Sequence, residues 1–215
     1  MIPETWKKNG GFGINVGVCD TGLNKNLPCF VNKNITYKQF GDVSLRHGTH
    51  IASTIYQIAP KVNMFFAGGI LDNFSRMEKM LKWLSTFDLD VLNLSLAFKI
   101  PDDGVMSVLR RINDKGTMII CAYARDAKFP WSEKDFLSAG EEGDFPAPKA
   151  FVSYSSSGSL TRMKGTSVSA AITTGLYSLG KSVDKTLTKQ SFLSTVKPTD
   201  VPEYEQKKRQ VNIKL

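Results

Sequence analysis

The chain has 215 residues, of which 41% are hydrophobic and 22% charged, and its formal net charge is +8. This composition is ordinary for a globular protein, and the length predicts a single domain spanning residues 1–215. No run of about 18 apolar residues occurs, so we expect neither a membrane-spanning helix nor a membrane partner.

The three cysteines are too few for a disulfide framework, and the first residues lack the apolar core of a signal peptide. Both features favour a cytoplasmic protein. Cys19 and Cys121 fall in predicted buried strands, where a thiol behaves as a small apolar group. A redox role for Cys19 beside Asp20 is the alternative, but strand alternation places the two side chains on opposite faces.

Short apolar runs alternate with helical periodicity along the chain. The candidate strands are Ile14–Val18, Val62–Ala67, Val91–Ser95, Thr117–Ala122 and Phe151–Tyr154. Apolar residues at helical spacing predict three helices, marked by Met77, Met80, Leu81 and Leu84, then Val105, Val108, Leu109 and Ile112, then Val168, Ala171, Ile172, Leu176 and Leu179. Continuous apolar strands separated by helices predict an α/β fold, with a parallel sheet flanked by helices on both faces.

Three short motifs follow one another along the chain: Asp20-Thr21-Gly22, His47-Gly48-Thr49-His50 and Gly165-Thr166-Ser167. A carboxylate, an imidazole and a hydroxyl are the groups that acyl transfer by serine requires. Asp20 directly follows a predicted strand, and sites in parallel sheets lie at the carboxyl ends of strands. Each motif alone is weak, but the three together predict catalytic residues Asp20, His47 and Ser167.

The base must be His47 or His50, because the chain has no other histidine. A helix that begins near Gly48 would leave His47 at its edge, facing a cleft, and would bury His50 in the first turn. Metal binding by this H-x-x-H pair is the alternative, but the sequence offers no recognisable third ligand. We therefore expect no metal site.

Ser167 precedes a long apolar helix. A nucleophile at a helix N-terminus gains a backbone N–H that points at a developing oxyanion, and the helix dipole favours negative charge there. The alternative is that Thr166 or Ser167 only caps the helix. The presence of Asp20 and His47 favours the nucleophile.

These motifs resemble those of the subtilisin-like serine proteases, whose acid, base and nucleophile follow the same order along the chain. The resemblance extends to most of the chain: Ile14–Gly22 to the strand ending in D-T-G, His47–Ile55 to the H-G-T-H helix, Ala59-Pro60 and Val62–Ala67 to the A-P-x-A-x-L strand, Val91–Leu96 to the V-I-N-M-S-L strand and Gly165–Ala171 to G-T-S-M-A-S. It implies a three-layer sandwich, a serine endopeptidase activity without a cofactor, and a polypeptide substrate.

The resemblance also implies the substrate-binding residues. Ser95, Leu96 and Ala97 would pair with the substrate backbone and wall the first specificity pocket. Ala122, Tyr123 and Ala124 match the end of the family strand A-A-G-N, which would lie opposite these three residues. Ala97-Phe98 replaces the usual Gly-Gly of the family and should narrow or reshape that pocket.

The oxyanion position departs from the family pattern. Counting without gaps from Gly116, Arg125 stands where the family has the asparagine that donates to the oxyanion. Its guanidinium could donate, pair with Asp126 or block the site. A shift of one residue would put Asp126 there instead.

Two parts of many relatives are missing. Ile51–Ile58 runs directly into Ala59-Pro60, which leaves no room for their calcium loop, and Asp20 lies too close to Met1 for a propeptide. We therefore expect no need for calcium at that position, and either a mature fragment with an added Met or a compact enzyme that folds unaided.

Two other function classes remain. An Arg125 that impairs the site would make the chain a pseudoprotease that binds peptide or protein. The positive charge is consistent with nucleic-acid binding, but the basic residues are scattered apart from Lys207–Arg209 and no nucleic-acid-binding signature accompanies them. We therefore expect a serine endopeptidase without a nucleic-acid partner.

Overall fold

A six-stranded sheet forms the centre of the computed structural model, which describes residues 4–99, 102–126 and 134–196. Its strand order is β2-β3-β1-β4-β5-β6, and every neighbouring pair is parallel. The strands are β1 (Asn15–Asp20), β2 (Ile35–Gln39), β3 (Asn63–Gly68), β4 (Val91–Leu94), β5 (Met118–Ala122) and β6 (Leu137–Ala139). The basic residues Lys207–Arg209 lie outside the described residues.

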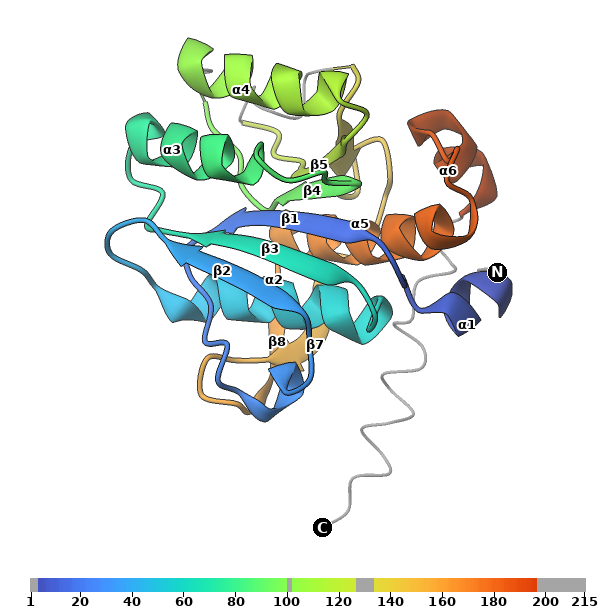
Figure 1. The fold of residues 1–215 in the computed structure, drawn as a ribbon, viewed down its shortest axis with the longest axis horizontal. Helices are drawn as coiled ribbons and strands as arrows, with labels where there is room; N and C mark the ends of the chain where they lie inside the picture. The colour runs from blue at the N-terminus through green and yellow to red at the C-terminus, as the bar shows by residue number, and fades with distance from the viewer. Residues whose placement is uncertain (1–3, 100–101, 127–133, 197–215) are drawn as a thin grey trace.

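Helices cover both faces of this sheet (Figure 1). On one face lie α3 (Phe74–Leu84) and α4 (Asp103–Asp114), and on the other lie α2 (Leu45–Ile58) and α5 (Thr166–Val183). The remaining elements are α1 (Glu4–Asn9), the short helix η1 (Pro28–Phe30), α6 (Lys189–Thr195) and the strands β7 (Ala150–Tyr154) and β8 (Leu160–Lys164). The predicted fold class, a parallel sheet flanked by helices on both faces, is confirmed.

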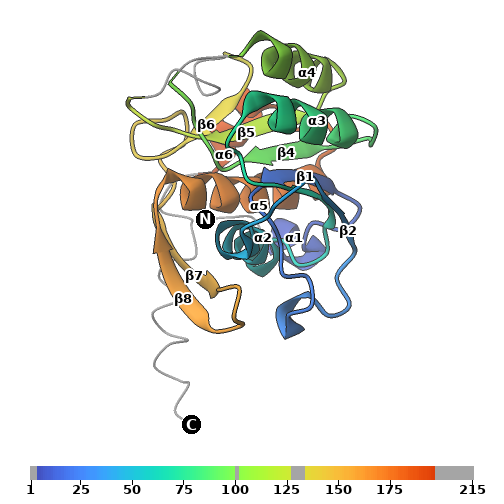
Figure 2. The same ribbon diagram turned by 90° about the vertical axis from the view of Figure 1, so that its left-hand side faces the viewer.

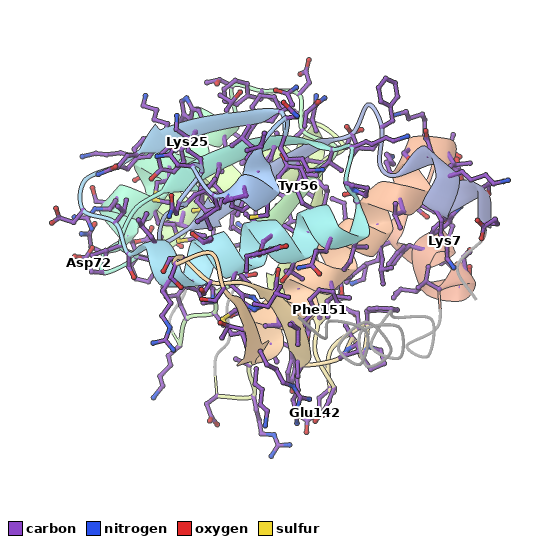
Figure 3. The ribbon with its side chains drawn as sticks, turned by 90° about the horizontal axis from the view of Figure 1, so that it is seen from below. Lys7, Lys25, Tyr56, Asp72, Glu142 and Phe151 are labelled. Carbon is purple, nitrogen blue, oxygen red and sulfur yellow. The ribbon has the colours of Figure 1, made fainter. Side chains whose placement is uncertain are left out.

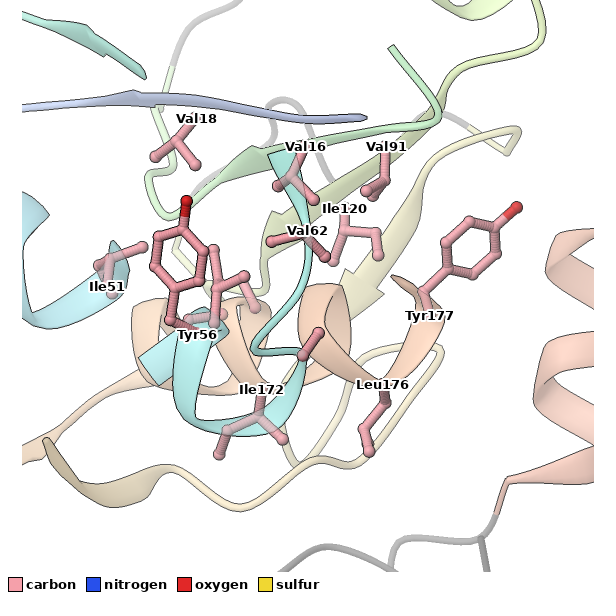
Figure 4. Close-up of a cluster of buried hydrophobic side chains, with 14 of the residues drawn as sticks. Val16, Val18, Ile51, Tyr56, Val62, Val91, Ile120, Ile172, Leu176 and Tyr177 are labelled. Atoms are coloured by element: carbon pink, nitrogen blue, oxygen red, sulfur yellow. The ribbon is translucent and has the colours of Figure 1, made fainter. Parts of the chain in front are cut away.

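Burial on both faces explains why the central strands are apolar throughout. Figure 4 shows the cluster between the sheet and helices α2 and α5, in which Val16, Val91 and Ile120 meet Ile172 and Leu176. A second cluster packs α3 and α4 against the opposite face and contains Cys19 and Cys121. Both cysteines are fully buried, and burial raises the pKa of each thiol, so the reading as structural thiols fits the fold.

The last predicted strand lies outside the main sheet. β7 pairs with β8 as an antiparallel hairpin, and Figure 2 shows this hairpin on the far side of α2 and α5 from the main sheet. An apolar run alone cannot distinguish a strand of the main sheet from a strand of this hairpin, because Ala150 and Phe151 are buried in both cases, here against α2 rather than within the main sheet.

The carboxyl ends of β1, β2 and β3 converge at one edge of the sheet, at the left in Figure 1. The backbone N–H of Ser44 donates to Thr21 O at 3.0 Å, which ties the start of α2 to the end of β1. Helix α2 begins at Leu45, three residues before the expected start, so His47 lies inside its first turn. No described helix is long and apolar enough to cross a membrane.

Gly48 allows α2 to approach β1. A Cβ at this position would clash with Gly22 O and lie 3.1 Å from Asp20 Oδ1, and neither can retreat easily because Gly22 O is a backbone atom just after β1 and Asp20 is the last residue of β1. We therefore expect Gly48→Ala to lower the free energy of unfolding by about 2–3 kcal/mol, measured by urea denaturation. Gly104→Ala is the matched control, since its Cβ would approach only the ends of the side chains of Asp102 and Glu78, at 3.2 Å. A Gly48→Ala variant as stable as this control would contradict the prediction.

Candidate active site

Asp20 is the last residue of β1, and its side chain is 2% exposed. Its Oδ1 accepts a hydrogen bond from the Thr21 backbone N–H at 2.6 Å, and the Thr21 hydroxyl, whose single hydrogen can serve either oxygen, lies 3.2 Å from Asp20 Oδ1 and 2.7 Å from Ser44 O. A buried carboxylate requires such donors. These bonds fix the carboxylate at the carboxyl edge of the sheet, facing the first turn of α2.

His47 lies against this carboxylate. Its Nδ1 is 2.7 Å from Asp20 Oδ1, and since a carboxylate only accepts, the proton is assigned to Nδ1. Burial lowers the pKa of His47, but the hydrogen bond to Asp20 and the charge of Asp20 together outweigh burial, so the pKa is raised above 6.5. In the neutral ring, Nε2 is then free to accept a proton.

His50 has a different environment. It is 2% exposed, and its Nε2 donates to the backbone oxygen of Thr161 in β8 at 3.0 Å. Burial, the largest effect, lowers the pKa of His50 below 6.5. This histidine therefore joins α2 to the β7–β8 hairpin, in agreement with its expected structural role.

Ser167 is the second residue of α5 and is half-buried. Its hydroxyl donates to Ser95 O at 2.9 Å, and among the described residues no hydrogen bond joins it to His47. Its backbone N–H has no acceptor in the described part of the chain, while the N–H groups of Val168 and Ser169 both point back to Gly165 O. The structure thus brings Asp20 and His47 into direct contact and leaves Ser167 bonded to the end of β4.

Ser95 and Asn93 join the end of β4 to the start and the middle of α5. The Ser95 hydroxyl lies 2.8 Å from Ser167 O and 2.9 Å from Asn93 Oδ1, and its single hydrogen can serve either oxygen. Asn93 Nδ2 donates to Thr174 Oγ1 at 2.9 Å. Asn93 was not singled out from the sequence, although a buried amide within an apolar strand is a signal that could have identified it.

The segment after Ser95 forms part of the wall at this edge. Leu96 and Phe98 pack with the cluster beneath α3 and α4. The Phe98 ring meets Phe74 at the start of α3, with centroids 5.0 Å apart. Ala97 is half-buried between them. The Phe98 side chain, which was expected to narrow or reshape the pocket, is thus packed against α3.

Arg125 follows β5 and is 75% exposed. Its guanidinium pairs with Glu142 in the loop after β6, and the Tyr123 hydroxyl donates to the same carboxylate at 3.2 Å. This pair holds the pKa of Glu142 below its ordinary value. Asp126, the partner considered from the sequence, is not the one that the guanidinium contacts.

Gly140 lies between Tyr123 and Thr166, the residue that precedes Ser167. A Cβ on Gly140 would lie 2.9 Å from Thr166 Cγ2 and 3.1 Å from Tyr123 Cβ. Tyr123 therefore lies close to the residue that precedes Ser167. Ala122 is buried beneath it and Ala124 is half-buried. No cluster of three or more possible metal ligands occurs among the described residues.

The overall shape matches solved subtilisin-like proteases. A structure of the prenylagaramide maturation protease PagA has a TM-score of 0.71 at 19% identity, with 85% of this chain and 82% of that chain covered. A cold-adapted subtilisin-like serine proteinase has a TM-score of 0.72 at 20% identity, with 86% and 81% covered. No family model and no curated protein matches the sequence. The chain therefore has the subtilisin-like fold.

The two histidines should titrate on opposite sides of pH 6.5. We expect NMR of the imidazole protons to give a midpoint above 6.5 for His47 and below 6.5 for His50. Asp20→Asn removes the charge that raises the His47 midpoint, so burial should then bring it below 6.5, while the midpoint of His50, which burial lowers most, should stay below 6.5. A His47 midpoint that does not respond to Asp20→Asn would contradict this assignment.

Proposed function

We propose that this protein is a serine endopeptidase in which Asp20, His47 and Ser167 form the catalytic triad, and that residues 1–215 make up one peptidase domain. The hydrogen bond between His47 Nδ1 and the buried Asp20 carboxylate carries this proposal. It leaves the neutral ring of the only unburied histidine of the described chain with an unused acceptor, Nε2. The subtilisin-like fold and the position of Ser167 at the start of α5 support it.

In this mechanism His47 Nε2 takes the proton from Ser167 Oγ while the oxygen attacks the substrate carbonyl carbon. The Ser167 hydroxyl must first turn away from Ser95 O, a rotation about one side-chain bond. The buried Asp20 carboxylate stabilises the resulting imidazolium. His47 then gives the proton to the leaving amine, an ester forms on Ser167, and water hydrolyses it by the same steps.

Two groups are proposed to stabilise the oxyanion. The free backbone N–H of Ser167 is one, because unpaired donors at a helix start are suited to developing negative charge. Arg125 is proposed as the other, held in place by Glu142. Gly140 lies close to both Tyr123 and Thr166, and this closeness supports a position for Arg125 near the proposed nucleophile, Ser167.

A polypeptide substrate is proposed to lie along the carboxyl edge, between the ends of β4 and β5. Ser95, Leu96 and Ala97 would line one side, and Ala122, Tyr123 and Ala124 the other. The backbone oxygen of Ser95, which now accepts from Ser167, would become available to a substrate N–H once the hydroxyl turns. The alternative of a pseudoprotease predicts binding of peptide without cleavage.

Covalent labelling tests the nucleophile. We expect a fluorophosphonate to label the protein at one residue, Ser167, and Ser167→Ala to reduce both labelling and peptide hydrolysis by at least about a thousandfold. Ser169→Ala is the matched control on the same helix, because that hydroxyl is buried and its single hydrogen serves Ala147 O or Pro148 O. Mass spectrometry of the modified peptide locates the label. Labelling that is retained in Ser167→Ala would contradict the assignment of Ser167 as the nucleophile.

Kinetics of Arg125→Ala test the oxyanion donor. Because the donor acts on charge that develops in the transition state, we expect kcat to fall by about a hundredfold with little change in KM. Arg111→Ala, which removes an exposed arginine from α4, should leave both constants unchanged. A kcat that is unchanged or higher in Arg125→Ala would overturn the donor role, and a large loss in Asp126→Ala instead would move that role to Asp126.

A further inference from the structure

A polar pocket of about 500 Å³ opens between the end of β2 and the first turns of α3. It is lined by Phe40, Gly41, Asn73, Ser75, Arg76 and Lys79. Two of these residues are cationic and none is acidic. The pocket is separate from the Arg125–Glu142 pair, since Asp72, which precedes α3, and Glu142 lie at different margins of the molecule in Figure 3.

Arg76 presents an open hydrogen-bonding edge to this pocket. Its Nη1 donates to Ile70 O at 2.7 Å and to Asp72 Oδ1 at 2.9 Å, which fixes the guanidinium. In the residues that the structure describes, its Nε and Nη2 donate to no acceptor. A Cβ on Gly41 would lie 3.4 Å from Nε and 3.5 Å from Nη2, so the absence of a side chain there keeps this edge uncovered. Such an edge binds a carboxylate through two parallel hydrogen bonds.

The neighbouring side chains suit the same ligand. Lys79 lies one helical turn beyond Arg76, is exposed and forms no ion pair with any described residue. Phe40 contributes half-buried apolar surface, and Lys38 Nζ lies 5.2 Å from the centroid of its ring. A glutamate side chain could thus place its methylene groups on Phe40 and its carboxylate between Arg76 and Lys79.

Backbone contacts place the pocket on the edge that carries Asp20. The N–H of Gly69 donates to Asp20 O at 3.0 Å, and the N–H of Ile70 donates to Asp42 O at 2.8 Å. The loops that follow β1, β2 and β3 therefore meet, and Gly69 itself packs against Arg76. A polypeptide that crosses the carboxyl edge of the sheet at the triad can extend past the end of β3 to the end of β2 and reach the pocket.

We propose, on the basis of the proposed peptidase function, that this pocket is a specificity site for an acidic side chain of the substrate, remote from the scissile bond. Arg76 provides the bidentate contact and Lys79 the additional charge. The class of substrate is then a polypeptide with a glutamate or aspartate at a fixed distance from the bond that is cleaved.

Fluorogenic peptides that differ only by Glu or Gln at one position, scanned along the sequence, test this proposal. We expect one position at which Glu raises kcat/KM about fivefold at low salt, with the preference decreasing as salt is added. Lys79→Gln and Arg76→Gln should abolish the preference, while kcat for the Gln peptide stays the same. Lys82→Gln is the matched control, since that lysine lies on α3 but pairs with Glu78 and does not line the pocket. No preference at any position, or one that survives both pocket variants, would overturn the proposal.

A binding measurement separates the failure of the pocket from the failure of the peptidase. In Ser167→Ala, anisotropy of a labelled peptide with Glu at the scanned positions should show tighter binding than its Gln counterpart, and Lys79→Gln should remove the difference. If fluorophosphonate labelling of the unmodified protein fails but this binding is seen, the pocket stands and the peptidase does not. If labelling succeeds and the two peptides bind equally, the pocket is refuted and the peptidase stands.

Discussion

The hydrogen bond between Asp20 and His47 is the contact on which the candidate active site depends. It requires a buried carboxylate at the end of β1 and a helix that starts close enough to present an imidazole to it. The Thr21 N–H fixes the carboxylate, the Ser44 N–H fixes the start of α2, and Gly48 permits the close approach. The same contact raises the pKa of His47 and leaves its Nε2 as the acceptor that a serine nucleophile needs.

Ser167, the proposed nucleophile, is positioned by a separate set of contacts. Ser95 bonds to Ser167 at the start of α5 and Asn93 bonds to Thr174 in the middle of that helix, so the end of β4 holds α5 at two points. In this arrangement the Ser167 hydroxyl is bonded to Ser95 O, a backbone acceptor that the proposed substrate would also use. Binding of substrate and release of the hydroxyl toward His47 would then be coupled.

Much of the fold could be predicted from the sequence, because the central strands are buried on both faces and so consist of unbroken apolar runs. β2 and β8 could not be predicted in this way, since most of their side chains are exposed and leave no apolar run. The order of Asp20, His47 and Ser167 predicted the candidate triad, but not where the hydroxyl of Ser167 is bonded. The ion-pair partner of Arg125 could not be predicted either, because Glu142 belongs to a loop after a different strand and only the fold brings the two residues together.

The most direct test of the triad is a crystal structure of the protein with a peptide boronate, which forms a tetrahedral adduct with an activated serine. The account predicts a covalent bond from boron to Ser167 Oγ, with that oxygen turned away from Ser95 O and His47 Nε2 within hydrogen-bond distance of the adduct. One boronate oxygen should accept from the Ser167 N–H. A boronate that binds without a covalent bond, or an adduct on any other residue, would contradict the account.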